Sequence, residues 1–220
     1  MHSRTIIACL ALVIASARAS AETISFDDHP SGTAPPGFTS AVTGSGGPAV
    51  WRVQKAPGSE AGNVVAQTST ERIDNRFPVL VYDKIIAADI DASVKFQAVS
   101  GSIDQAAGLV WRYRDARNYY IVRANALEDN VVLYKVQNGV RTDLPLKGKG
   151  KTYGAAAPVS KTAWNLLAVR VRGDIFAVSL NGNALYEVED RTFQNAGKAG
   201  LWTKADSVML FDDLKIDAVK

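Results

Sequence analysis

Apolar and polar positions alternate along most of the chain after residue 21, and helical periodicity is nearly absent. Successive side chains of a strand point to opposite faces of a sheet, so short alternating or apolar runs bounded by turn residues predict strands. We expect strands near residues 23–27, 50–54, 63–67, 79–82, 88–98, 106–114, 118–125, 130–136, 139–144, 163–172, 174–181, 184–189, 197–203 and 207–217.

Tight turns separate these runs. Asn138-Gly139 and Asn181-Gly182 each lie between two of them, and Asn-Gly supplies the positive φ values that a two-residue type I′ hairpin needs. Residues 39–48 and the basic, glycine-rich stretch 147–161 are expected to be loops. Many short strands joined by turns are typical of an all-β sandwich or barrel. No linker or repeat divides residues 22–220, so we expect them to form one domain.

The N-terminus follows a different pattern. A short basic head precedes an apolar run from Ile6 to Ala15, and small residues follow up to Ala19-Ser20-Ala21. This order is that of a cleaved secretory signal peptide, and the run is shorter than the ~20 residues that cross a membrane. We expect residues 1–21 to be removed. The mature protein would be periplasmic or extracellular, start near Glu22 and have no membrane span.

Cleavage changes the composition of the mature chain. It removes Arg4 and Arg18 but no acid, so the formal charge falls from +3 to +1. A nearly neutral domain gives no reason to expect nucleic acid or an anionic membrane as a partner. Cleavage also removes Cys9, the only cysteine, so the mature domain has to be stable without disulfides.

The residue types that remain exclude several catalytic classes. His29 is the only histidine after residue 21, and no cysteine is left, so a cysteine nucleophile is impossible and a catalytic zinc is not expected. Glycoside hydrolysis would need two carboxyl groups about 5–9.5 Å apart. Glu128 and Glu187 are the candidates, because each has another acid close in sequence. Exposed charges that keep the protein soluble are the alternative.

Residues 108–136 carry the strongest binding signal, since aromatic residues alternate there with arginine and asparagine across three predicted strands. Flat rings stack on sugar faces, and planar donors bind vicinal hydroxyls. We therefore expect a saccharide or polysaccharide as partner. The alternative is that the rings form core and the arginines pair with acids. The candidate contacts are Trp111, Arg112, Arg123 and Asn125, together with Trp202 and Lys204 on one face of a later predicted strand.

Acidic residues also fall on apolar faces of the two terminal strands. Asp28 continues the face of Ile24 and Phe26, and Asp212 lies on an apolar face of the last strand. A carboxylate on such a face is destabilising unless it has a partner. A structural Ca²⁺ held by Asp28 and Asp212 is one solution. A bulge at Asp212-Asp213 or a salt bridge to an arginine are the others.

Three stretches resemble a known superfamily. They read GLVWRYRDARNYYIVRANALEDNVVLYKVQNG, WNLLAVRVRGDIFAVSLNGNALYEVED and AGKAGLWTKADSVMLFDDLKI. They are similar to the concanavalin A-like lectins and glucanases, and more narrowly to exported bacterial domains of the laminin-G-like and 3-keto-disaccharide hydrolase-like type. The resemblance implies an antiparallel two-sheet jelly roll with a concave sheet that binds saccharide and with neighbouring terminal strands. The E-x-D-x-x-E run of the family-16 glycoside hydrolases is absent from this sequence.

Three functions are compatible with these observations. The first is an exported, non-catalytic carbohydrate-binding domain. The second is a glycoside hydrolase acting on 3-keto-disaccharide-like or related glycosides. The third is a structural or adhesion module that binds protein. One fold of this kind can host all three, so the site has to decide between them.

Overall fold

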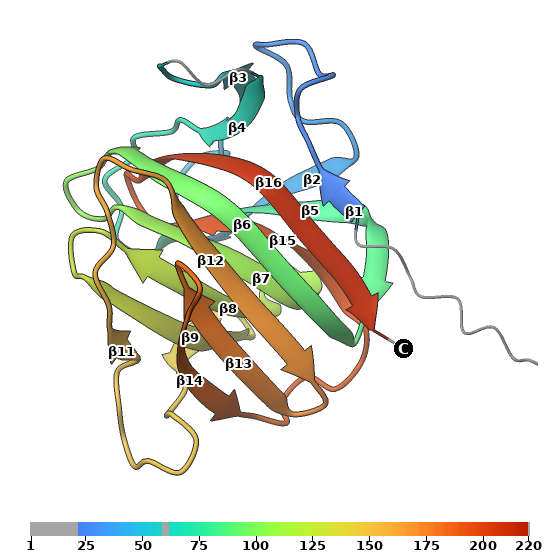
Figure 1. Ribbon diagram of the computed structural model, residues 1–220, viewed down its shortest axis with the longest axis vertical. Helices are drawn as coiled ribbons and strands as arrows, with labels where there is room; N and C mark the ends of the chain where they lie inside the picture. The colour runs from blue at the N-terminus through green and yellow to red at the C-terminus, as the bar shows by residue number, and fades with distance from the viewer. Residues whose placement is uncertain (1–21, 59–61, 220) are drawn as a thin grey trace, which may run out of the picture.

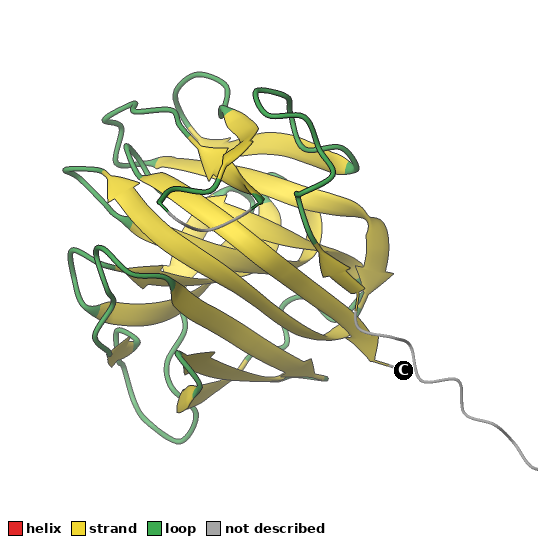
Figure 2. Cartoon of the chain, turned by 45° about the horizontal axis from the view of Figure 1, so that its top comes forward, coloured by secondary structure: helices red, strands yellow, loops and turns green. Residues whose placement is uncertain are grey.

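The computed structural model describes residues 22–58 and 62–219, and the regular structure of these residues is all β-strand. Two antiparallel sheets of eight strands each face one another as a sandwich (Figure 1, Figure 2). The expected all-β, two-sheet jelly-roll fold is thus confirmed. Within the described ranges, no helix has the length and apolarity needed to cross a membrane. The expected signal peptide lies outside these residues.

Sheet A is the layer nearer the viewer in Figure 1. Its strands, in spatial order, are β14 (Asn183–Glu189), β13 (Ile175–Leu180), β12 (Asn165–Arg172), β6 (Asp89–Ser100), β16 (Val208–Val219), β4 (Asn63–Gln67) and β3 (Trp51–Lys55), with β1 (Glu22–Ile24) paired to β16. Strand β16 therefore lies inside the sheet, between β6 on one side and β4 and β1 on the other.

Sheet B is the second layer. Its strands, in spatial order, are β10 (Val140–Asp143), β9 (Asn130–Gln137), β8 (Asn118–Asn125), β7 (Ala106–Asp115), β15 (Gly197–Thr203), β5 (Arg76–Ala87) and β2 (Phe38–Gly44), with β11 (Ala155–Ala156) paired to β9. Strand β10 is thus one edge of this sheet and β2 is the other.

The main core fills the space between the sheets. Strand β6 shows how alternation builds it, because its even-numbered residues from 90 to 98 are buried while the odd-numbered ones face outward. The Trp111 ring lies 5.6 Å from that of Tyr120 on the neighbouring strand of sheet B, and 5.3 Å from that of Phe176 across the interface in sheet A. Burial of each such side chain stabilises the fold by roughly 1.5–3 kcal/mol.

The predicted hairpins form as expected. Asn138 and Gly139 have φ values of 54° and 84°, and Asn181 and Gly182 have 51° and 80°. Strands β4, β8 and β15 have the predicted bounds. The expected loop at residues 39–48 is partly wrong, because residues 38–44 form β2. This edge strand consists mostly of small and polar residues, so its sequence shows little alternation.

The two terminal strands are neighbours, as the resemblance implied. Ile24 of β1 pairs with Leu214 of β16. The register of β16 shifts after Asp212, and Asp213 has a φ of 47°, which is the predicted bulge. The bulge turns Asp213 outward to an ion pair of 2.8 Å with Lys95.

Sheet B curls strongly toward its outer face. Thr43 of β2 and Tyr119 of β8 are four strands apart in the sheet, a distance of about 19 Å if it were flat, yet their hydroxyl oxygens lie 2.7 Å apart. Arg141 of the edge strand β10 likewise reaches Phe77 of β5, five strands away. The outer face of sheet B is therefore concave, and side chains from its two halves meet across it.

Candidate binding site

The concave face of sheet B is filled by its own side chains. Eleven apolar and aromatic residues on this face, which we call the concave cluster, are buried although they lie outside the space between the sheets. They are Phe77, Val79, Val81, Ala106, Val110, Tyr119, Ile121, Val132, Tyr134, Val136 and Trp202. The resemblance implied an open saccharide groove on this face. Its apolar part is closed, because the side chains of the concave cluster are buried.

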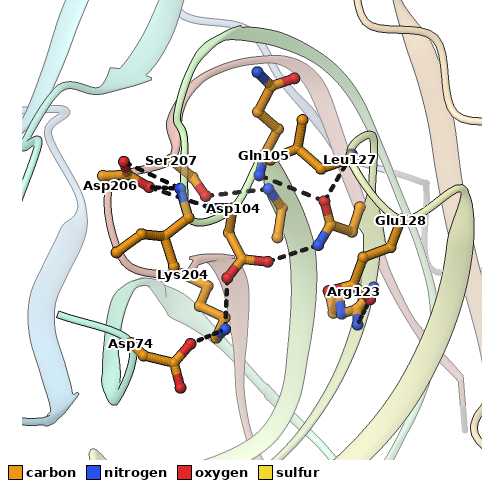
Figure 3. Close-up of polar contacts among 12 residues, drawn as sticks. Asp74, Asp104, Gln105, Arg123, Leu127, Glu128, Lys204, Asp206 and Ser207 are labelled. Atoms are coloured by element: carbon orange, nitrogen blue, oxygen red, sulfur yellow. Dashed lines mark hydrogen bonds and ion pairs between the residues drawn. The ribbon is translucent and has the colours of Figure 1, made fainter. Parts of the chain in front are cut away.

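Charged side chains gather at one end of this face (Figure 3). We call Asp74, Asp104, Arg123, Glu128 and Lys204 the polar cluster. They come from the loops before β5 and β7, from β8, from the β8–β9 turn, and from the end of β15. Segments far apart in sequence therefore bring three acids and two cations together.

Arg123 organises one half of the polar cluster. Its side chain is only 2% exposed. One terminal nitrogen donates to Glu128 at 2.8 Å, to the Tyr153 hydroxyl at 3.1 Å and to the Tyr134 hydroxyl at 3.2 Å, and the other donates to Asn130. Because both terminal nitrogens bond to protein groups, Arg123 positions other side chains and does not itself face solvent.

Glu128 and Tyr153 are the exposed members of this half. The Glu128 side chain is 40% exposed and Tyr153 is 53% exposed. Burial disfavours ionisation of Glu128, but the charge of Arg123 and hydrogen bonds from Asn130 and Arg123 outweigh it, and the pKa of Glu128 lies below its usual value. At neutral pH this position offers an ionised acceptor next to an exposed ring.

Asp104 and Lys204 form the other half. Lys204 Nζ lies 2.5 Å from a carboxylate oxygen of Asp104 and 2.5 Å from one of Asp74, and Asn125 donates to Asp104 at 2.6 Å. Burial raises the pKa of Asp104 despite the opposing bond from Lys204. The pKa of Lys204 is raised, because its bonds to the two acids outweigh its own burial.

A turn after β15 fixes the loop that carries Asp104. The Asp206 carboxylate accepts backbone hydrogen bonds from Ser102, Ile103 and Asp104 at 2.9 to 3.2 Å, and a further bond from the Ser102 hydroxyl at 2.8 Å. Burial opposes ionisation of Asp206, but these donors together lower its pKa. The position of Asp104 is therefore set by an ionised, fully bonded carboxylate behind it.

Two predicted contacts lie elsewhere. Trp111 is 1% exposed in the core between the sheets, because the alternation of β7 turns it inward. Arg112 is 2% exposed and donates to the carbonyl oxygens of Ala88, Phe193 and Gly173 and to the Asp89 carboxylate. The prediction that Trp111 and Arg112 contact a ligand is therefore corrected. Trp111 packs in the core, and Arg112 holds loops together.

The other four predicted contacts do share one face. Arg123, Asn125 and Lys204 belong to or touch the polar cluster, and Trp202 belongs to the concave cluster. None of the four is exposed, so each would act from behind the surface. The expected alternative for Arg123, a pairing with an acid, is what the structure contains.

The second carboxylate candidate lies on the other sheet. Glu187 is on the edge strand β14 of sheet A, where it pairs with Lys147 at 3.1 Å and is half exposed. Its cross-strand partner on β13 is Ala177. Glu187 therefore has the position of an exposed surface charge.

The acidic residues that act on Asp212 are Asp213 and Asp27. Asp27, and not Asp28, lies within electrostatic range of Asp212, and burial raises the pKa of Asp212, with the charges of Asp213 and Asp27 adding to this effect. Asp27 accepts a backbone bond from Asn63 at 2.7 Å. In residues 22–58 and 62–219, no group of three or more potential ligand side chains converges on a metal position.

Sequence reasoning missed Asp74, Asp104 and Tyr153. All three lie in loops, where strand alternation assigns no face, and their partners are between 19 and 130 residues away in sequence. Tyr153 in a basic, glycine-rich loop was the available sequence signal, since its ring offers a stacking surface and its hydroxyl a hydrogen-bonding group.

No family model and no curated protein sequence matches the chain. Solved structures do match it. A carbohydrate-binding module of type CBM66 from Bacillus subtilis has a TM-score of 0.62 at 19% identity, and the match covers 83% of this chain and 96% of that one.

Two further structures have a similar fold. Domain 4 of AbnA, an extracellular GH43 arabinanase from Geobacillus stearothermophilus solved with arabinotriose, has a TM-score of 0.56 at 14% identity and covers 91% of this chain and 93% of that one. A Bacillus subtilis protein of unknown function with a galectin-like fold has a TM-score of 0.53 at 12% identity, over 82% and 88%. At these identities the similarity establishes the fold alone.

Proposed function

We propose that this protein is an exported, non-catalytic carbohydrate-binding domain, and that a saccharide binds at the polar cluster on the concave face of sheet B. The expected signal peptide motivates the export. The carbohydrate ligand is motivated by the chemistry of the cluster and by the fold.

One observation carries the proposal. The Tyr153 hydroxyl and the Glu128 carboxylate both lie within 3.1 Å of the same Arg123 nitrogen, and both side chains are substantially exposed. An exposed ring offers a stacking surface for a sugar, and an ionised carboxylate accepts hydrogen bonds from its hydroxyls. Because the buried Arg123 holds both groups, little ordering is needed on binding.

The similar structures support the choice of ligand. One is a carbohydrate-binding module, and another was solved with arabinotriose bound. Both match more than four fifths of this chain. An arabino-oligosaccharide is therefore the first probe to use, followed by a broad glycan array.

The test is saccharide binding by the mature protein and by two variants. We expect at least one saccharide to bind, and we expect each variant to weaken binding by about tenfold or more. Glu128→Gln loses a charged hydrogen bond, which costs roughly 1.5–3 kcal/mol, and Tyr153→Ala loses the stacking ring. Isothermal titration calorimetry measures both effects.

Glu187→Gln is the matched control. It removes a carboxylate that is paired with a cation, as Glu128 is, but lies on sheet A, so its affinity should equal that of the wild type. A folded protein that binds no saccharide on the array, or whose binding is indifferent to both cluster variants, would refute the proposal.

A glycoside hydrolase is the second candidate. Its specific support is that the polar cluster holds two carboxyl groups with oppositely shifted pKa values, raised for Asp104 by burial and lowered for Glu128 against its own burial by Arg123. Such a divergence is typical of acid and base pairs. Asp104 is, however, 1% exposed and hydrogen-bonded. Turnover of a 3-keto-glycoside that Glu128→Gln abolishes would favour this candidate over the first.

A further inference from the structure

Three aromatic rings of the concave cluster, which we call the platform, lie around the guanidinium of Arg141. Phe77 and Trp202 are stacked, with ring centres 5.5 Å apart and planes inclined by 16°. Tyr134 is the third ring, and it connects the platform to the polar cluster, because its hydroxyl accepts a hydrogen bond of 3.2 Å from Arg123. All three rings are at most 3% exposed, although they are on an outer face of the sandwich.

Arg141 is what covers this platform. Its guanidinium carbon lies 4.5 Å from the ring centres of both Phe77 and Tyr134, and 5.8 Å from that of Trp202. A flat cation over ring faces is a favourable contact. One terminal nitrogen of Arg141 is nevertheless buried without a hydrogen-bond partner, which is costly for a charged group. The guanidinium of Arg141 is thus stabilised by contacts with ring faces, but its hydrogen bonds are incomplete.

The strand that carries Arg141 is free on one side. Strand β10 has four residues, and among the described strands it pairs with β9 alone. Its first residue, Val140, is 66% exposed. The Asp74 carboxylate, whose side chain is 76% exposed, lies within electrostatic range of Arg141 and can act as an acceptor. The pKa of Asp74 is lowered mainly by its bond from Lys204, against partial burial, and the charge of Arg141 adds to this effect.

We propose that Arg141 is a displaceable cover over a saccharide-stacking platform. The ring of a bound saccharide displaces the guanidinium toward Asp74 and stacks on Phe77, Tyr134 and Trp202. This inference rests on the proposed function and extends its site from the polar cluster onto the concave face. A saccharide has the required chemistry, because one of its faces is apolar and its edge carries hydroxyls that the adjacent polar cluster can bind.

The first experiment tests the cover without any saccharide. Hydroxyl-radical footprinting should show increased modification of Phe77 and Trp202 in Arg141→Ala relative to the wild type. Arg170→Ala is the control, because Arg170 is an arginine on the outer face of sheet A with 69% exposure. If Arg141→Ala folds poorly, Arg141→Lys keeps the charge but covers less ring area. Unchanged modification in a folded variant would overturn the inference.

The second experiment measures affinity for arabinotriose, or for the best saccharide on the array. If the open state holds ~10% of the wild-type molecules, removal of the cover should tighten binding about tenfold. Arg170→Ala should leave the affinity unchanged. Binding by Arg141→Ala that is equal to or weaker than that of the wild type overturns the cover and leaves the proposed function intact. Binding by neither protein overturns the proposed function and this inference together. Binding by the variant alone supports the cover.

Discussion

Buried arginines hold the loops of this protein in place. Arg76, Arg112 and Arg123 are each at most 2% exposed, and each donates to a group at least 29 residues away in sequence. A buried cation is tolerated only with such partners. Removal of one partner lowers the stability of the fold by more than the net contribution of the pair, because it leaves a buried charge unpaired. A sequence pattern can place an arginine on a face, but it cannot show whether a loop folds over it. Arg112 and Arg123 were therefore open to both interpretations.

Asp206 provides a test at the same scale. We expect Asp206→Asn to lower the free energy of unfolding at pH 7 by about 1–3 kcal/mol, since hydrogen bonds to a charged acceptor are weakened. The native pKa of Asp206 lies below its unfolded value of about 4. Its stabilisation is therefore complete above that value and is lost as the pH falls through the native pKa. Urea denaturation should show a smaller difference between wild type and variant at pH 3, and an equal difference would contradict this account.

Edge strands decide how far the sequence could predict the fold. Inner strands carry a clear signal, so their existence could be derived: β6 has one buried apolar face, and β8 is a largely apolar run that ends at turn residues. Strand β2 has one neighbour and small polar residues, and it looked like a loop. The curl of sheet B was also not predictable, because it depends on contacts such as that between Thr43 and Tyr119, which join residues 76 positions apart.

The turn that precedes β10 offers a prediction for this element. Gly139 has a φ of 84°, and a β-branched residue there is strained. Gly139→Val should lower the free energy of unfolding by about 1–2 kcal/mol and accelerate hydrogen exchange of the β10 amides. Gly182→Val is the matched control, because Gly182 has a φ of 80° in an equivalent hairpin of sheet A. Gly182→Val should lower the free energy of unfolding by a similar amount but leave the hydrogen exchange of the β10 amides unchanged. If the β10 amides exchange equally fast in both variants, β10 does not open independently of the rest of the sandwich.

At the level of the whole molecule, the sandwich and the pairing of its terminal strands were predictable. The open saccharide groove that the resemblance implied is not present, because that face is closed. The concave cluster and Arg141 close that face. Residues such as Trp202 and Tyr134 alternate correctly, so their face could be derived. Their cover could not, because it comes from the edge strand β10, which lies four strands away from the strand of Trp202.

Export is the remaining whole-molecule prediction. We expect N-terminal sequencing of the protein from its native host to begin at or near Glu22, in a periplasmic or extracellular fraction. A protein recovered from the cytoplasm with residues 1–21 still attached would contradict the assignment of a signal peptide.

The place of β16 inside sheet A has a consequence for how the chain is made. Residues 208–219 lie between β6 and β4, which are complete more than 100 residues earlier. Until these residues leave the ribosome, both neighbours present unpaired backbone edges, and the layer cannot close. The nascent chain therefore stays open through most of its synthesis, and it depends on contacts of long sequence separation that form late and slowly.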